Sequence, residues 1–234
     1  MTISPLTIGE LADGVIFLHK KGFKVSCNNA YGMVWKEEDF YIFSEQLKKL
    51  ANFYIENPKV EPCSLMDMPI QYIRFKAKKW CGAGTALVCI DRTGQKFPCH
   101  TFLPSSGIKT DMGKFFHDLS SDDLLDNQCE DCILASFCPT CYGINFVENY
   151  DITKRNAQYC LFSKIRAKAV SYMLSVMLTN RQRDYIYLKS KSDTDIKYII
   201  SGIKEISNFD IVSIPASPTS GLVCESWKKS ASSP

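Results

Sequence analysis

Hydrophobic positions recur at helical spacing in four stretches of the chain. The clearest is residues 36–58, KEEDFYIFSEQLKKLANFYIENP, where acidic residues open the expected helix and Pro58 follows its end. Residues 7–20, 156–179 and 193–208 show similar spacing. The pattern predicts four helices. Two apolar stripes should face a core, one formed by Phe40, Phe43, Leu47, Leu50 and Tyr54, the other by Leu161, Ile165, Ala169, Tyr172 and Val176.

Strand signals are short and few. A stop at Gly22 followed by an apolar run predicts a strand over residues 23–27. Between residues 85 and 98, TALVCI, DRTG and QKFP predict a hairpin with Gly94 at positive φ. A short helix is expected over 114–119, and the Ser/Pro-rich tail from residue 212 is expected to be disordered. We therefore expect an α+β chain.

The composition is typical of a soluble globular protein and gives no reason to expect a strongly charged partner. Hydrophobic residues make up 45% of the chain and the net charge is +3, which gives no electrostatic case for nucleic acid or membrane binding. Lys76, Lys78 and Lys79 are expected to form a solvated edge. No apolar run reaches the roughly 18 residues of a membrane span, and the first residues do not form a secretory leader. We expect a cytoplasmic protein with reduced thiols.

Cysteine placement points to metal. Four of the 11 cysteines, Cys129, Cys132, Cys138 and Cys141, have the spacing C-x2-C-x5-C-x2-C. Crowded thiolates repel one another unless a cation neutralises them, and C-x2-C is a common chelating loop. Soft sulfur ligands suit zinc or iron–sulfur clusters. Ribbon-type pairs that share one zinc usually stand roughly 15–20 residues apart, so the short gap here favours ligands divided between two sites. A zinc-stabilised interaction domain without redox activity is the alternative.

Three more cysteines extend the pattern. Cys81, twelve residues, Gly94, four residues and Cys99 precede the run, and Cys160 follows it. This order is similar to the SPASM domain, the seven-cysteine extension of radical SAM enzymes that modify peptides and proteins. The resemblance covers about residues 81–165, and the last interval of the run is one residue shorter than is common in the family.

The resemblance implies two [4Fe–4S] clusters with crossed ligands. Cys129, Cys132, Cys138 and Cys160 would hold the second cluster. Cys81, Cys99 and Cys141 would hold three irons of the first, and Cys63 is either its fourth ligand or a free or buried thiol. Three other cysteines are interpreted as non-ligands: Cys89 as a small core residue, Cys27 and Cys224 as ordinary thiols.

His100 stands directly after Cys99, where sulfatase-maturing members of the family carry a catalytic aspartate, so that activity is not expected. Two roles remain open for this histidine: moving protons beside a cluster, or only donating a hydrogen bond. His19 is interpreted as a surface or helix-packing residue.

The resemblance also implies how the chain is organised. Residues 1–62 would be the end of a radical SAM barrel, 63–80 a linker, 81–180 the SPASM domain with its hairpin and cluster-binding loops, 181–211 a helical extension and 212–234 a tail.

A further implication concerns activity. The chain contains no C-x3-C-x2-C motif, so S-adenosylmethionine cleavage is expected only in a complete enzyme. Expected partners are a peptide or protein substrate and a redox protein such as flavodoxin or ferredoxin, and the clusters would transfer electrons or anchor substrate.

Overall fold

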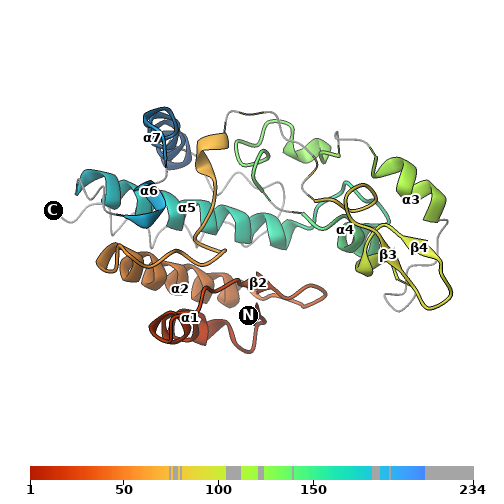
Figure 1. The fold of residues 1–234 in the computed structure, drawn as a ribbon, viewed down its shortest axis with the longest axis horizontal. Coiled ribbons are helices and arrows are strands. Elements are labelled where there is room, and N and C mark those ends of the chain that lie inside the picture. The colour runs from red at the N-terminus through yellow and green to blue at the C-terminus, as the bar shows by residue number, and fades with distance from the viewer. Residues whose placement is uncertain are drawn as a thin grey trace. The chain divides into compact units, whose positions relative to one another are not determined.

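The structure, a computed structural model, describes residues 1–73, 75, 79, 81–103, 112–120, 124–138, 140–180, 185–189 and 191–208. It is a mixed fold in which helices dominate and the strands are few and short, as expected for an α+β chain. The chain divides into two compact units (Figure 1). We call residues 1–74 with 161–234 the helical unit, and residues 75–160 the cysteine unit. Among the described helices, none is both long and apolar enough to cross a membrane.

The helical unit starts with a small parallel sheet. Strand β1 (Thr2–Ile3) pairs with β2 (Asn28–Asn29), and the 3-10 helix η1 (Ile8–Glu10) and helix α1 (Leu11–Lys20) form the crossover. The Asn28 amide donates to the Met1 carbonyl at 3.0 Å and the Ala30 amide to the Ile3 carbonyl at 2.7 Å. The strand predicted over 23–27 is therefore wrong in its bounds, because pairing occurs only where the chain reaches the N-terminal residues.

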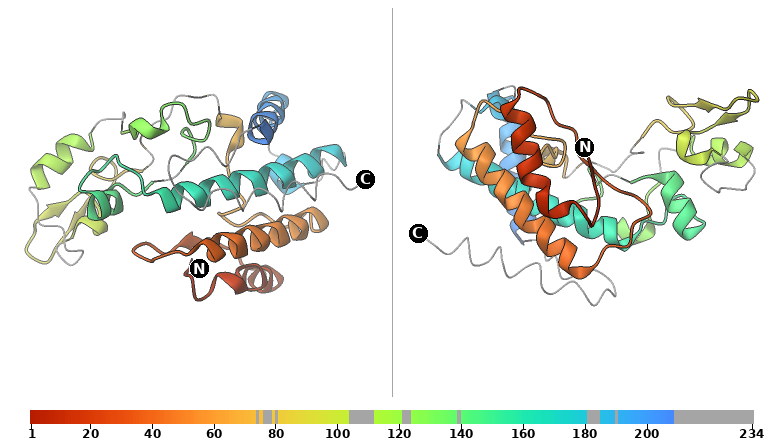
Figure 2. Two further views of the ribbon diagram at one scale, coloured as in Figure 1. Left: turned by 180° about the vertical axis from the view of Figure 1, so that it is seen from behind. Right: turned by 90° about the horizontal axis from the view of Figure 1, so that it is seen from below.

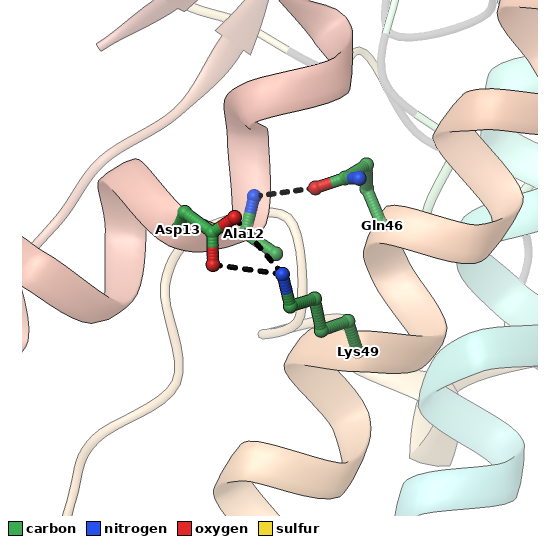
Figure 3. Close-up of polar contacts among 4 residues, drawn as sticks. All are labelled: Ala12, Asp13, Gln46 and Lys49. Atoms are coloured by element: carbon green, nitrogen blue, oxygen red, sulfur yellow. Dashed lines mark hydrogen bonds and ion pairs between the residues drawn. The ribbon is translucent and has the colours of Figure 1, made fainter.

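Helix α2 (Glu37–Glu56) confirms the strongest sequence signal. The Asp39 carboxylate accepts the Lys36 amide at 2.7 Å and caps the first turn. Every residue of the predicted stripe on this helix is at most 3% exposed. Helix α1 packs against α2, and its Ala12 amide donates to Gln46 Oε1 at 2.9 Å (Figure 3).

Helix α5 (Ala157–Thr179) is enclosed more fully than its sequence pattern suggests. Its Phe162 ring lies 4.7 Å from Trp35, 4.8 Å from Phe40 and 4.9 Å from Phe43, measured between ring centroids. Further along α5, Lys168 Nζ donates to the Ile206 carbonyl of the last described helix at 2.7 Å. Helices therefore cover α5 from more than one direction (Figure 2), and the single predicted stripe is too narrow.

Helix α7 (Asp193–Asn208), also predicted, packs on the 3-10 helix η2 (Ile70–Tyr72), and the short α6 (Ile186–Lys189) precedes it. A Cβ atom on Gly202 would lie 2.6 Å from the Ile70 carbonyl oxygen. Only glycine permits this approach of α7 to η2.

The cysteine unit has a small core and little regular structure. Strands β3 (Cys89–Ile90) and β4 (Lys96–Phe97) form the predicted antiparallel hairpin, and Gly94 has φ +85°. The other elements are η3 (His100–Phe102), α3 (Met112–Asp118), η5 (Asn127–Cys129) and α4 (Tyr142–Asn149). Nine buried residues form one cluster here: Ala83, Phe97, Cys99, Phe102, Phe115, Leu119, Leu124, Tyr142 and Ile152. The tail expected to be disordered lies outside the described residues.

Lys79 departs from the solvated edge expected for it. Its ammonium group donates to the carbonyl oxygens of Ala83 and Leu119, each at 2.5 Å. This side chain therefore ties the start of the hairpin segment to the end of α3. Lys76 and Lys78 lie outside the described residues.

Candidate metal centre

The seven cysteines expected from the sequence to be ligands all belong to the cysteine unit. None of them forms a disulfide, and their burial differs. Cys99 and Cys138 are buried and Cys81 is exposed, whereas the remaining four are partly exposed: Cys129, Cys132, Cys141 and Cys160. Cys63 lies in the helical unit and is fully buried.

Successive tight turns hold the first three cysteines of the run. The Cys132 amide donates to the Cys129 carbonyl at 3.1 Å, and the Cys138 amide donates to the Leu134 carbonyl at 2.8 Å. Burial raises the pKa of the Cys129 thiol to about 12, and the thiolates of Cys138 and Cys132 act in the same direction. Cys132 and Cys138 therefore lie close enough to affect Cys129, and a bound cation would favour the thiolate form of Cys129.

Asp126 connects this run to the segment before Cys160. One carboxylate oxygen accepts the Gln128 amide at 2.9 Å, and the other accepts the Arg155 amide at 2.7 Å. The Asp126 side chain is only 5% exposed, so both contacts are largely shielded from water. Cys160 follows in the first turn of α5, where its amide donates to the Asn156 carbonyl at 3.3 Å.

Cys141 has different neighbours, although it follows Cys138 by three residues. It precedes α4, and the amides of Ile144 and Gly143 hydrogen-bond to its sulfur, as does the Thr101 side chain. Burial raises the pKa of the Cys141 thiol, these hydrogen bonds lower it, and the thiolate of Cys99 raises it. Cys141 is thus associated with Cys99 at the end of the hairpin segment.

Gly143 makes this association possible. A Cβ atom at this position would lie 2.7 Å from Thr101 Cγ2 and 2.8 Å from Thr101 Cβ. Contacts this short do not occur between real side chains, so α4 approaches η3 closely only because residue 143 is glycine. This approach places Thr101, two residues after Cys99, beside the first turn of α4, which begins directly after Cys141.

The turn that holds Cys81 is built from the glycines of CGAG. Gly84 has φ +74°, and its amide donates to the carbonyl oxygens of Leu87 and Pro98 at 3.0 and 2.9 Å. Gly84 therefore turns the backbone at the start of the hairpin segment.

The residues fit an iron–sulfur or zinc site by donor chemistry and by grouping. Thiols are the ligands that both centres prefer. Cys132 and Cys138 act on Cys129, and Cys99 acts on Cys141. Within the described residues, no three His, Cys, Asp or Glu side chains converge closely enough to hold one ion. Metal ligands are commonly drawn together by the metal itself, so the structure provides the grouping of the thiols rather than a finished coordination sphere.

The other residues singled out from the sequence have clear surroundings. Cys89 packs against the core of the cysteine unit, as expected, and His100 is exposed at the start of η3. Cys63 hydrogen-bonds to the Cys27 thiol in the helical unit, an arrangement that the 36-residue spacing does not reveal. Cys224 lies outside the described residues.

The sequence interpretation missed Thr101 and Gly143. The sequence does contain a signal for Gly143. This glycine lies two residues after Cys141, in the first turn of a helix, where a glycine is unusual unless another segment packs closely against it. Comparison of the chain with protein-family models gave no match, and a search of curated proteins also found none.

Proposed function

We propose that this chain is the iron–sulfur-binding auxiliary region, of the SPASM type, of a radical SAM enzyme that modifies peptides or proteins. Cys129, Cys132, Cys138 and Cys160 would hold one [4Fe–4S] cluster, and Cys81, Cys99 and Cys141 would hold three irons of the other. Such clusters supply electron transfer or an anchoring site for substrate. Because Cys63 is hydrogen-bonded to Cys27 within the helical unit, we assign it as a buried thiol rather than as the eighth ligand.

One observation carries the proposal. Cys141 is three residues from Cys138 in sequence, yet its thiol is associated with Cys99 and Thr101 of the hairpin side. Cys129 is instead associated with Cys132 and Cys138. A single zinc bound by the whole run would not require this division, whereas two clusters with crossed ligands would.

Further support comes from the remainder of the chain. The parallel pair of β1 and β2, with α1 between them and α2 after them, has the β/α order expected for the end of a barrel. Because the chain has no C-x3-C-x2-C motif, S-adenosylmethionine chemistry belongs to a complete enzyme, for which a peptide or protein and a flavodoxin- or ferredoxin-like partner are the proposed companions.

The decisive measurement is metal content after anaerobic reconstitution. The proposal expects a brown protein with about eight irons and eight sulfides per chain. A colourless protein that binds stoichiometric zinc and no iron would instead support the structural zinc domain.

Two cysteine variants test the crossed ligands. Cys132→Ala and Cys141→Ala should each remove about half of the iron, and each should abolish a different electron paramagnetic resonance signal of the reduced protein. Cys89→Ala is the matched control, because this cysteine lies in the hairpin but is not a proposed ligand, and it should retain all of the iron. Loss of the same signal in both ligand variants would contradict the division.

A further inference from the structure

The helical unit contains a second, separate thiol site. Cys27 is 2% exposed and Cys63 is fully buried, and their thiols are hydrogen-bonded to each other. Neither belongs to the cysteine unit that would carry the clusters. Two thiols in contact inside a folded unit have a chemistry of their own, which is the formation of a disulfide.

The backbone around the pair is fixed independently of the sulfurs. The Ser64 hydroxyl accepts the Cys27 amide at 2.7 Å and donates to the Cys27 carbonyl at 2.8 Å. The Arg166 side chain of α5 donates to the carbonyl oxygens of Ser64 and Leu65 at 2.9 and 3.0 Å. These contacts hold Cys27 beside Ser64, and Cys63 directly precedes Ser64, so the two cysteines lie on adjacent segments of the backbone.

Polar groups around the two sulfurs give them unequal roles. The Cys63 sulfur accepts hydrogen bonds from the Cys27 thiol and from the amides of Leu65 and Met66, and the nearby Tyr54 hydroxyl also lowers the pKa of Cys63. The hydrogen bond from Cys27 is the largest effect, and it lowers the pKa of Cys63 while raising that of Cys27. Cys63 is thus the thiol placed to react first, and Cys27 is placed to follow.

The Tyr54 hydroxyl lies between His19 and Cys63. His19 Nδ1 lies 3.1 Å from the Phe23 carbonyl, which requires a proton on Nδ1 and leaves Nε2 free to accept. Nε2 lies 2.9 Å from the Tyr54 hydroxyl. The Tyr54 hydroxyl oxygen also accepts the Cys63 amide at 2.9 Å, so this hydroxyl links His19 to the backbone of Cys63.

We propose that Cys27 and Cys63 form a reversible intramolecular disulfide when hydrogen peroxide enters the helical unit. The Cys63 sulfur attacks one peroxide oxygen, the O–O bond breaks, and the leaving hydroxide combines with the Cys63 proton to form water. Cys27 then attacks the resulting sulfenic sulfur, the S–O bond breaks, and hydroxide leaves with the Cys27 proton as a second water. Two electrons pass from the thiols to the peroxide, and a small dithiol reductant reverses the change.

Peptide mapping of the full chain tests this directly. Trypsin releases Cys27 in residues 25–36 and Cys63 in residues 60–74, with one cysteine in each peptide. Brief peroxide treatment, alkylation under denaturing conditions and digestion should yield these two peptides joined, and the product should disappear after reduction. Cys27→Ser and Cys63→Ser should each abolish it. Absence of the joined pair, or a disulfide from Cys63 to any cysteine of the cysteine unit, would overturn the proposal.

Tyr54→Phe separates the effect of the hydroxyl from simple packing. Removal of the hydroxyl takes away the acceptor of the Cys63 amide and a group that lowers the pKa of the Cys63 thiol, so disulfide formation should slow by about tenfold while the circular dichroism spectrum is retained. Tyr185→Phe is the matched control, because Tyr185 is also buried in the helical unit but its hydroxyl donates to the Ile55 carbonyl. An unchanged rate in Tyr54→Phe would overturn the role given to this hydroxyl in activating Cys63.

Iron content keeps this inference distinct from the proposed function. Cys27→Ser and Cys63→Ser should leave the iron per chain of the reconstituted protein unchanged. Loss of iron in Cys63→Ser would show that Cys63 is a cluster ligand and would overturn the disulfide. The joined peptides remain a valid result if the protein binds zinc or no metal.

Discussion

The helical unit and the cysteine unit achieve order by different means. In the helical unit, long helices bury large side chains, among them Phe43, Leu47, Leu50 and Tyr54, which are 0% exposed. The cysteine unit has nine residues in its core cluster and strands of only two residues. Apolar burial provides most of the stability of a folded domain, whereas small cysteine-rich units commonly need a metal as well. The helical unit therefore folds by packing, whereas we propose that the order of the cysteine unit also depends on a bound metal.

Metal removal should produce the largest difference in stability between the two units. Chelation should expose residues 75–160 to rapid proteolysis, because the binding free energy of a structural metal is on the order of 10 kcal/mol. Cleavage sites mapped by mass spectrometry, with and without chelator, measure the effect. The helical unit should stay protected under the same conditions. Equal cleavage of both units would mean that they do not differ in their dependence on metal.

Phe43→Ala should destabilise the helical unit and leave metal binding by the cysteine unit unchanged. This ring is 0% exposed and contacts Phe162 in the centre of the helical unit, so its removal should cost about 3–5 kcal/mol of unfolding free energy. Urea denaturation followed by far-ultraviolet circular dichroism measures the loss. Ile42→Ala on the same helix is the control and should cost far less, since Ile42 is 37% exposed. Loss of bound metal in folded Phe43→Ala would argue against independent units.

Gly143→Ala tests whether the two proposed clusters of the cysteine unit respond differently to a change beside Cys141. The added methyl group would lie 2.7 Å from Thr101, so α4 must move away from η3 at a cost of about 1–3 kcal/mol. The signal of the cluster assigned to Cys141 should change more than that of the cluster assigned to Cys132. Gly9→Ala serves as the control, since no atom lies within 4 Å of a Cβ built there. Equal spectra for Gly143→Ala and the unmodified chain would show that the close approach does not position Cys141.

Lys49→Ala should have the smallest effect. Lys49 Nζ lies 2.8 and 2.9 Å from the Asp13 carboxylate oxygens, but both side chains are at least half exposed (Figure 3). Exposed ion pairs contribute about 0.2–1 kcal/mol, and salt screens them. Urea denaturation at low and high salt should show a small difference that vanishes at high salt. A loss as large as that of Phe43→Ala would mean that the contact of α1 with α2 depends on charge rather than on packing.

Periodicity predicted the helical unit well, because its helices are long enough to repeat their pattern. The buried stripe of α2 is clear in the sequence. The parallel strands β1 and β2 were missed or misplaced, since two-residue strands contain no repeat and their register depends on a partner distant in sequence. The enclosure of α5 was underestimated for the same reason: only the folded chain shows that α2 and α7 both contact it.

Spacing predicted two sets of cysteine ligands, which stay a prediction, and it did not predict the contacts that hold these cysteines. The run from Cys129 to Cys141 and the hairpin cysteines all fall within one unit. The supporting contacts of Asp126, Thr101 and Gly143 join segments that are far apart in sequence. The Cys27–Cys63 pair has no short motif, so only the fold brings the two thiols together.

The packing of Trp35 against Phe162 gives the helical unit an optical reporter. Trp35 is 4% exposed and its ring meets Phe162 nearly edge-on, at an interplanar angle of 78°. The sequence contains only two other tryptophans, Trp80 and Trp227. A chain with phenylalanine at those two positions would emit from Trp35 alone, and its blue-shifted emission would follow the opening of the helical unit in real time.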